Sequence, residues 1–186
     1  MPATAPAPTH DPAIEEHLFA DDGLVPNNPS LPLMVYRGVL EPGPEAADRC
    51  TARFAANGWG GAWRNGVYPH HHYHGTAHEA LGIATGSARV RLGGERGEVV
   101  SLQQGDVVVI PAGVAHKCEG ASPDLLVVGA YPRGQNPDLR TPGVRERERA
   151  LHDIARVPLP LRDPVYGENG PLIRRWKRTK DAAPRD

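Results

Sequence analysis

Histidines and one glutamate gather in two segments of the chain, and these residue types bind transition metals. Residues 66–86 hold five histidines between positions 70 and 78, followed by Glu79, and residues 105–116 end at His116. Neutral imidazoles together with one carboxylate suit Mn, Fe, Co, Ni or Zn. Four protein ligands leave one or two coordination positions open, which distinguishes a catalytic site from a closed structural one. We therefore predict metal chemistry at a mononuclear site.

The first segment has the alternation expected of a strand over residues 68–74. Alternate side chains of a strand share one face, so His70, His72 and His74 would point the same way. His71 would then point to the opposite face. The alternation does not decide the position of His70: it would lie either beside the metal or exposed at the rim of the site.

The remaining ligands would come from later strands. Glu79 follows a bend at residues 75–76, and His116 follows a turn at residues 111–113, so both can return toward the first strand. His78 competes with Glu79, because neighbouring residues of a regular strand point to opposite faces. We favour Glu79 and keep His78 as the alternative.

From Gly61 to about residue 135, apolar and polar residues alternate with a period of two between glycine-containing turns. Short strands spaced in this way predict an all-β barrel or sandwich. The expected strands span residues 34–40, 61–65, 68–74, 78–84, 88–92, 97–102, 106–110, 114–118 and 124–131. Helices are expected at 45–57 and 144–155, with a last short element at 172–176 and frayed residues from 177 onward.

This pattern divides the chain into four parts. Residues 1–22 form a Pro/Ala-rich tail that we expect to be disordered. Residues 23–60 supply an extended segment, a strand and a helix that pack on a barrel core at 61–135, and 136–186 add a helix and an extended tail. The part from 23 to 33 has too many prolines for a central strand, so we expect it to run over the surface.

Two spaced motifs give this chain a family resemblance. The first has a glycine, His-x-His, a glutamate and a second glycine, filled by Gly66, His72, His74, Glu79 and Gly86. The second has a glycine, Pro-x-Gly and a histidine, filled by Gly105, Pro111, Gly113 and His116. Gly120 stands where an asparagine is usual, which affects a turn more than the ion. Over roughly 60–135 the chain thus resembles the cupin superfamily.

The resemblance implies a double-stranded β-helix, or jelly-roll barrel, with one divalent metal held by His72, His74, Glu79 and His116. Four flanking stretches, which begin at Asp22, Trp59, Val128 and Asp163, look like the YjlB-like branch of single-domain bacterial cupins. That branch carries no activity that can be transferred. Cupins with three histidines and one glutamate include dioxygenases, oxalate-converting enzymes and isomerases, and the fold does not choose among them.

We therefore expect a metal-dependent enzyme, dioxygenase-like or of an isomerase or decarboxylase type, that acts on a small oxygen-bearing organic substrate. The metal would be Fe, Mn, Ni, Zn or Co, and Glu79 would both ligate it and move a proton. The alternative is a metal-dependent protein that binds or senses a small molecule without turnover.

Substrate contacts are expected from Arg64, Tyr68, Tyr131 and His70. An inward Arg64 would pair with a carboxylate on the substrate, although a register slip of one residue would turn it outward. Trp63 is more simply a packing residue, and Cys118 a small buried apolar one rather than a thiol near the metal.

Charge and cysteine content limit the kinds of partner and the compartment that we expect for this protein. Twenty-one basic and 22 acidic residues leave a formal charge of −1, which gives no reason to expect nucleic acid or an anionic membrane surface. Two cysteines make no disulfide framework, and the N-terminus lacks a secretory signal, so we expect a cytoplasmic protein. Cupins often cover open sheet edges by pairing, so we expect a homodimer, with residues 23–40 or the last residues contributing.

Overall fold

The computed structural model describes residues 13–182, which form nine strands and three helices. In chain order these are β1 (Ile14–Phe19), β2 (Asn28–Tyr36), α1 (Ala46–Ala56), β3 (Trp59–Asn65), β4 (Glu79–Thr85), β5 (Ser87–Leu92), β6 (Glu98–Gln103), β7 (Val107–Ile110), β8 (His116–Ala121), β9 (Leu126–Pro132), α2 (Val144–Ile154) and α3 (Pro171–Ala182).

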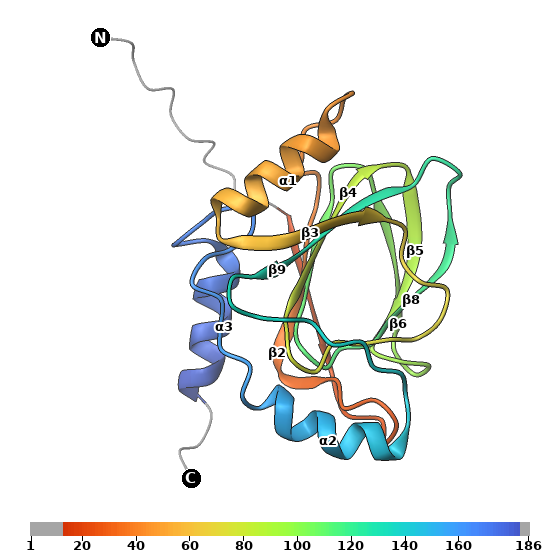
Figure 1. The fold of residues 1–186 in the computed structure, drawn as a ribbon, viewed down its shortest axis with the longest axis vertical. Coiled ribbons are helices and arrows are strands. Elements are labelled where there is room, and N and C mark those ends of the chain that lie inside the picture. Colours follow the sequence, from red (N-terminus) through yellow and green to blue (C-terminus); the bar gives the residue numbers. More distant parts are fainter. Residues whose placement is uncertain (1–12, 183–186) are drawn as a thin grey trace.

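The strands form two antiparallel sheets that face each other as a barrel (Figure 1). The larger sheet has the order β1-β2-β7-β4-β9-β3, and the smaller has the order β6-β5-β8. Non-consecutive neighbours in the larger sheet show that the chain crosses repeatedly between the two sheets. This architecture confirms the predicted all-β jelly-roll class with a few flanking helices.

Apolar residues of alternate positions fill the space between the sheets. In β4 and β7 these are Leu81, Ile83, Val108 and Ile110, which pack with residues of β5 such as Val90. Both faces of β4 and β7 are buried, whereas β5 alternates buried with more exposed residues and shows the period of two. The alternation of side chains along β4 also places Glu79 on the inward face, two residues before Leu81.

Helices α1 and α3 cover the outer face of the larger sheet (Figure 1). On α1, Cys50 and Phe54 are four residues apart and share the buried side. The facing position on β4 is Gly82, where an added Cβ would lie 2.4 Å from the Cys50 Sγ. On α3, the indole N–H of Trp176 donates to the carbonyl of Pro32 at 2.9 Å. Small residues on β4 thus let α1 approach the sheet closely.

Residues 68–74 are not the strand that the sequence predicts. They form a loop joined to its neighbours by two isolated bridges, His72 to His116 and Tyr73 to Arg140. A strand needs a continuous ladder, and this loop instead makes separate backbone contacts, among them Tyr68 with Cys118 and His74 with Gly113, that form no ladder. The histidines nevertheless approach the barrel, because the backbone of His72 exchanges hydrogen bonds with that of His116 at 2.9 and 3.2 Å.

The proline-rich segment is also placed differently from the prediction. Residues 28–36 form β2, between β1 and β7, and its last residues 34–36 pair on both sides. Pro29 and Pro32 are compatible with a strand because they fall in the irregular part of its pairing with β1, where the register shifts. Their missing N–H groups therefore remove no bond from the regular ladder.

The two ends of the chain are more regular than expected. Within the tail predicted over 1–22, residues 1–12 lie outside the described residues, but Ile14–Phe19 form β1 at the edge of the larger sheet. At the other end, α3 continues to Ala182, beyond the predicted fraying point at 177. Among the residues described, no helix has the length and apolar character needed to cross a bilayer.

The two thiols should differ sharply in reactivity. Cys50 is 1% exposed, and burial raises its pKa to about 12. Cys118 is partly exposed, with its Sγ 3.4 Å from the carbonyl oxygen of Gly120. Because the thiolate is the reactive form, we expect a maleimide at pH 8 to modify Cys118 well before Cys50 in the folded protein. Mass spectrometry of the labelled peptides measures this; equal labelling rates would contradict it, and both should react in denaturant.

Candidate metal centre

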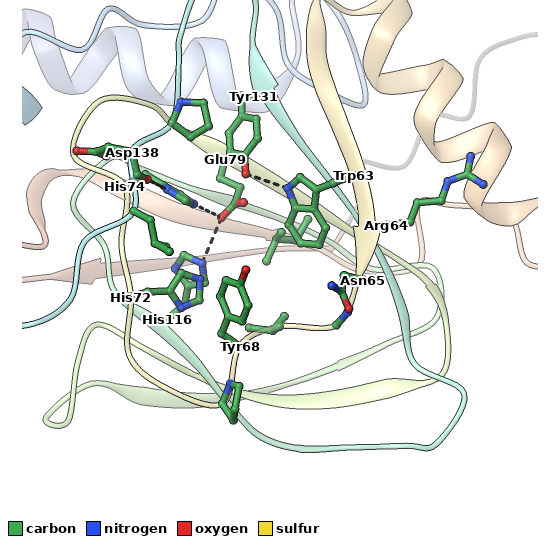
Figure 2. A pocket seen from close by; sticks show the side chains of 16 residues that line it. Trp63, Arg64, Asn65, Tyr68, His72, His74, Glu79, His116, Tyr131 and Asp138 are labelled. Carbon is green, nitrogen blue, oxygen red and sulfur yellow. Dashed lines mark hydrogen bonds and ion pairs between the residues drawn. The ribbon is translucent and has the colours of Figure 1, made fainter.

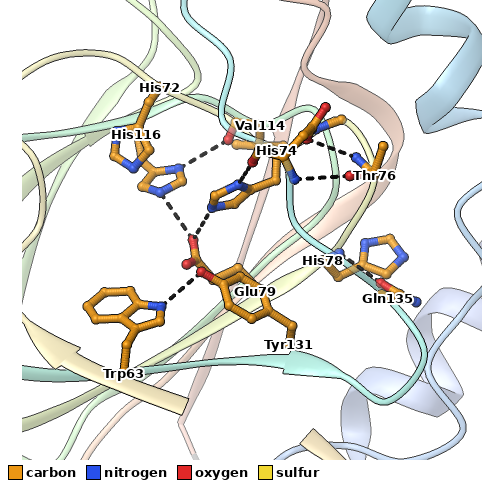
Figure 3. Close-up of polar contacts among 12 residues, drawn as sticks. Trp63, His72, His74, Thr76, His78, Glu79, Val114, His116, Tyr131 and Gln135 are labelled. Carbon is orange, nitrogen blue, oxygen red and sulfur yellow. Dashed lines mark hydrogen bonds and ion pairs between the residues drawn. The ribbon is translucent and has the colours of Figure 1, made fainter. Parts of the chain in front are cut away.

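Three buried side chains bring potential metal ligands together at one end of the barrel (Figure 3). Glu79 begins β4, His116 begins β8, and His74 lies on the loop before β4. The Glu79 Oε2 is 3.3 Å from the His74 Nε2 and 3.2 Å from the His116 Nε2. One ligand atom from each residue lies within 4.8 Å of the others. A single ion could therefore contact all three.

Each of the three predicted histidine ligands has its Nδ1 next to a backbone carbonyl. The pairs are His72 with His70 at 3.1 Å, His116 with Val114 at 3.3 Å, and His74 with Asp138. A carbonyl oxygen can only accept, so Nδ1 carries the proton and Nε2 presents its lone pair. Metal-binding histidines are usually oriented in this way by a partner of the other nitrogen.

The charge distribution at this cluster suits a cation. Glu79 is 2% exposed, and burial alone would raise its pKa, but the neighbouring His116 and His74 hold the pKa well below its ordinary value. Neither imidazole contact has hydrogen-bond geometry, so among the described residues the buried Oε2 has no hydrogen-bond partner. A buried carboxylate oxygen without a donor is costly unless a cation approaches it. The residues present therefore fit a divalent metal.

Protons compete for the same atoms. Burial would lower the pKa of His74, but the nearby Glu79 carboxylate outweighs burial, and the pKa is raised. The protonated form of His74 is thus favoured next to Glu79. Because a metal ligand must be the neutral imidazole, metal binding at this cluster would displace that proton.

His72, the fourth predicted ligand, lies beside this group. Its ring centroid is 4.1 Å from that of His116, and the side chain is buried. Its nitrogens are not among the ligand atoms that converge within 4.8 Å. Burial, followed by the charge of His116, lowers the pKa of His72 to about 3, so its imidazole stays neutral near pH 7.

The other histidines of the first segment are placed elsewhere. His78 points away from the cluster: its Nδ1 accepts the backbone N–H of Ala112 at 2.9 Å, and its ring contacts Trp176 at 4.7 Å between centroids. His70 is exposed and stacks on Tyr68, with ring centroids 5.2 Å apart. His71 is buried, with its Nε2 3.0 Å from the Glu95 carboxylate.

Arg64 does not face the cluster. Its guanidinium donates to the Asp48 carboxylate at 2.7 Å and to the Thr51 hydroxyl at 3.2 Å, both on α1. Figure 2 shows the Arg64 side chain directed away from His74, Glu79 and His116. The register explains this, because Trp63 pairs with Gly129 and faces the barrel interior, so its neighbour on β3 points outward. The inward arginine considered from the sequence is therefore an outward one in the structure.

A cavity of about 540 Å³ opens beside the cluster, and Figure 2 shows the residues that line it. Tyr131 and Trp63 meet there, with the indole N–H donating to the Tyr131 hydroxyl at 2.9 Å. The Tyr131 ring also meets His74 edge-on, with centroids 5.6 Å apart. Burial and the nearby Glu79 carboxylate raise the pKa of Tyr131. Tyr68 lines the same cavity and is half exposed.

Comparisons with known proteins agree with this fold. A sequence profile of the family described as cupin matches residues 64–137. The Bacillus subtilis (strain 168) protein named Uncharacterized protein YjlB is 41% identical over 162 residues, which are 87% of this chain and 96% of that protein. The chain belongs to the cupin family. Within the family, this cupin belongs to the YjlB-like branch.

A solved structure titled acireductone dioxygenase from Bacillus anthracis with cadmium ion in active center is also similar to this cupin. The identity is 16%, the TM-score is 0.35, and the match covers 50% of this chain and 63% of that one. A likeness of this size carries no information about the activity of this cupin.

Asp138 supports the site of this cupin and was not identified from the sequence. Its carbonyl accepts the Nδ1–H of His74, and its carboxylate accepts the backbone N–H groups of Gly75 at 2.6 Å and Thr76 at 3.3 Å. The carboxylate also pairs with Arg140, which reaches Asp153 on α2 at 2.5 Å. No spacing pattern marks Asp138, because its partners are 62 to 64 residues away.

Removal of the Asp138 carboxylate should weaken metal binding. In Asp138→Ala the turn at residues 75–76 loses its acceptor, so the backbone next to His74 is less firmly positioned, although the Asp138 carbonyl still accepts the His74 Nδ1–H. Loss of a direct outer partner typically lowers metal affinity by about 10–100-fold, so we expect a loss near the lower end, about 10-fold. Competition with a chromophoric chelator measures this. Asp124→Ala, at an exposed aspartate, is the matched control and should leave the affinity unchanged; an unchanged affinity in Asp138→Ala would contradict the assigned role.

Proposed function

We propose that this cupin is a mononuclear metal-dependent enzyme that acts on a small oxygen-bearing organic substrate. The observation that supports this most strongly is the convergence of the His74, Glu79 and His116 ligand atoms beside a cavity. Buried carboxylate and imidazole groups that converge with outer hydrogen bonds in place are the expected form of a metal site.

We place His72 in the ligand set with those three residues. Its neutral imidazole, with the Nδ1 directed at the carbonyl of His70, leaves the Nε2 lone pair available. Its ring lies next to that of His116, with centroids 4.1 Å apart, beside the converging ligand atoms. Three imidazoles and one carboxylate suit Fe, Mn, Ni, Co or Zn. Such an ion, when bound, would polarise a substrate oxygen or, if it is redox-active, activate dioxygen.

The residues around the cluster have separate roles in this proposal. Glu79 holds the ion and can accept a proton from a substrate that lies against it, since its carboxylate is the only acidic group among the ligands. Tyr131, fixed by the indole N–H of Trp63, orients the substrate near Glu79. Apolar residues such as Leu81 and Val67 help to line the cavity and limit access of water.

Turnover is the test of this proposal. Metal-free protein would be loaded in turn with Fe(II), Mn(II), Ni(II), Co(II) or Zn(II) and mixed with hydroxy acids, keto acids and diketones. Oxygen uptake detects dioxygenase chemistry, and proton NMR of the mixtures detects isomerisation or decarboxylation. We expect turnover with at least one metal, abolished by Glu79→Gln and retained by Asp124→Ala. Metal and substrate binding with no turnover for any combination would favour a binding or sensing protein instead.

A further inference from the structure

The walls of the cavity beside the candidate metal centre show what it can accept. The indole of Trp63 lies flat against the backbone of β9 at Gly129, where an added Cβ would be only 2.0 to 2.4 Å from three indole atoms. Glycine at this position is what allows the ring to lie there. One face of the indole is thus occupied by β9, and the ring lines the cavity (Figure 2).

Two tyrosines complete an aromatic wall, which we define as Trp63, Tyr68 and Tyr131. Tyr131 is fixed by its hydrogen bond to the Trp63 N–H at 2.9 Å. Tyr68 lies at the opposite side: its backbone carbonyl accepts the N–H of Cys118 on β8 at 2.9 Å, and its half-exposed ring contacts the ring of His72 at 5.1 Å between centroids. Figure 2 shows the three rings around the same space. The rings of Trp63 and Tyr131 are oriented before any ligand arrives, which reduces the entropy lost when a flat molecule packs against them.

Positive charge is scarce around this space. Arg64 is the one basic residue other than histidine among the residues that line the cavity, and it is turned outward to Asp48. The Asp138 carboxylate is occupied by backbone N–H groups and by Arg140. A ligand carboxylate or phosphate away from the cluster would lose its water without gaining a cationic partner. The cavity is therefore unsuited to a second anionic group.

We propose that this cavity takes a planar, uncharged organic molecule whose hydroxyl group, of phenol or enol type, is directed at the His74–Glu79–His116 cluster. This rests on the proposed metal-dependent function, which it deepens by naming the substrate class. The aromatic wall selects for a flat ring or conjugated system, and the lack of an inward cation selects against a remote charge.

Binding to protein loaded with one equivalent of Zn²⁺ tests the proposal without relying on turnover. Isothermal titration would compare phenol with cyclohexanol, and 4-hydroxybenzamide with 4-hydroxybenzoate. We expect phenol to bind about three- to tenfold more tightly than cyclohexanol, because only phenol gains the aromatic contact. We expect the neutral amide to bind at least about tenfold more tightly than the carboxylate. Equal binding in the first pair, or a preference for 4-hydroxybenzoate in the second, would overturn the proposal.

Variants locate the binding on the aromatic wall. Trp63→Leu should weaken phenol binding about three- to tenfold and cyclohexanol binding much less. Gly129→Ala should act similarly, because the added methyl group displaces the indole although the tryptophan itself is not substituted. Arg64→Gln should change neither amide nor carboxylate binding. Loss of 4-hydroxybenzoate binding in Arg64→Gln would show that Arg64 turns inward and would overturn the proposal.

Zinc content and thermal unfolding of each variant distinguish a failure of this proposal from a failure of the proposed metal-dependent function. Wild-type protein that binds no Zn²⁺ at the cluster defeats the metal-dependent function itself. Wild-type protein that binds Zn²⁺ normally but shows no aromatic preference defeats only the substrate class. If Trp63→Leu unfolds, Trp63→Phe takes its place. We expect Trp63→Phe to lose less phenol affinity than Gly129→Ala, because a smaller ring can still lie against β9, whereas the added methyl group of Gly129→Ala displaces the ring.

Discussion

Replacing His116 by alanine should lower the affinity for a divalent transition metal by at least about 100-fold. His116 contributes one of the three converging ligand atoms, and its Nε2 is 3.2 Å from the Glu79 carboxylate. Loss of a ligand must cost more than loss of an outer partner, which already costs about 10–100-fold. Glu79→Gln should have an effect of similar size, because it removes the only charged ligand. Chelator competition with Co²⁺ or Zn²⁺, supported by elemental analysis, measures both.

His70→Ala is the matched control for this experiment. It also removes a histidine from the same part of the chain, but His70 is exposed and stacks on Tyr68 outside the converging atoms. Its affinity should stay within about twofold of the wild type. A His116→Ala variant that retains wild-type affinity, or a His70→Ala variant that loses it, would place the metal elsewhere.

His72→Ala distinguishes a site of four protein ligands from one of three. If His72 completes the set, its removal should weaken binding about as much as removal of His116. If its imidazole only packs against His116, the loss should stay below about tenfold. Full metal occupancy in the double variant His72→Ala/His116→Ala would contradict the site as a whole.

Replacing Asp163 by alanine should lower the free energy of unfolding by at least about 3 kcal/mol. Asp163 is 0% exposed, and its carboxylate accepts the Tyr36 hydroxyl at 2.7 Å and the backbone N–H groups of Val165, Tyr166 and Leu172 at 2.8 to 3.1 Å. Hydrogen bonds to a charged group contribute about 1.5–3 kcal/mol each, and a buried donor without an acceptor costs about 1–3 kcal/mol. Urea unfolding of metal-free protein measures the change.

Two variants bracket this effect. Tyr36→Phe removes one of the four donors and should cost less than Asp163→Ala, while exposed Asp124→Ala should change stability by less than about 0.5 kcal/mol. A loss below about 1 kcal/mol in Asp163→Ala would show that this aspartate does not hold the C-terminal segment to the sheet.

The barrel could be predicted from the sequence because its strands alternate between two different environments. On β5 the side chains alternate between buried and more exposed positions, which gives a period of two, whereas β4 and β7 are buried on both faces, between the smaller sheet and the helices. The convergence of His74, Glu79 and His116 could be predicted because the family motifs fix their spacing. Alternation does not determine the register of β3, that is, which of its side chains point into the barrel. In the structure Trp63 points inward, so Arg64 points toward α1.

Other features depend on contacts between distant residues that no local pattern records. The loop at 68–74 has the alternation of a strand, but it is paired through isolated bridges to His116 and Arg140 rather than through a continuous ladder. Asp138 supports His74 across 64 residues, and the stretch that begins at Asp163 resembles a family segment without showing that its carboxylate binds Tyr36. The prolines of β2 suggested a surface segment because the irregular pairing with β1 that accommodates them is a tertiary feature.

The central claim is that one metal ion binds where His74, Glu79 and His116 converge. A crystal structure of protein loaded with one equivalent of Zn²⁺, with anomalous data collected on both sides of the zinc edge, tests it directly. We predict one anomalous peak, about 2.0–2.2 Å from the His74 Nε2, the His116 Nε2 and a Glu79 carboxylate oxygen. A peak at His70, His71 or His78 instead, or no ordered peak in protein that retains the ion, would contradict it.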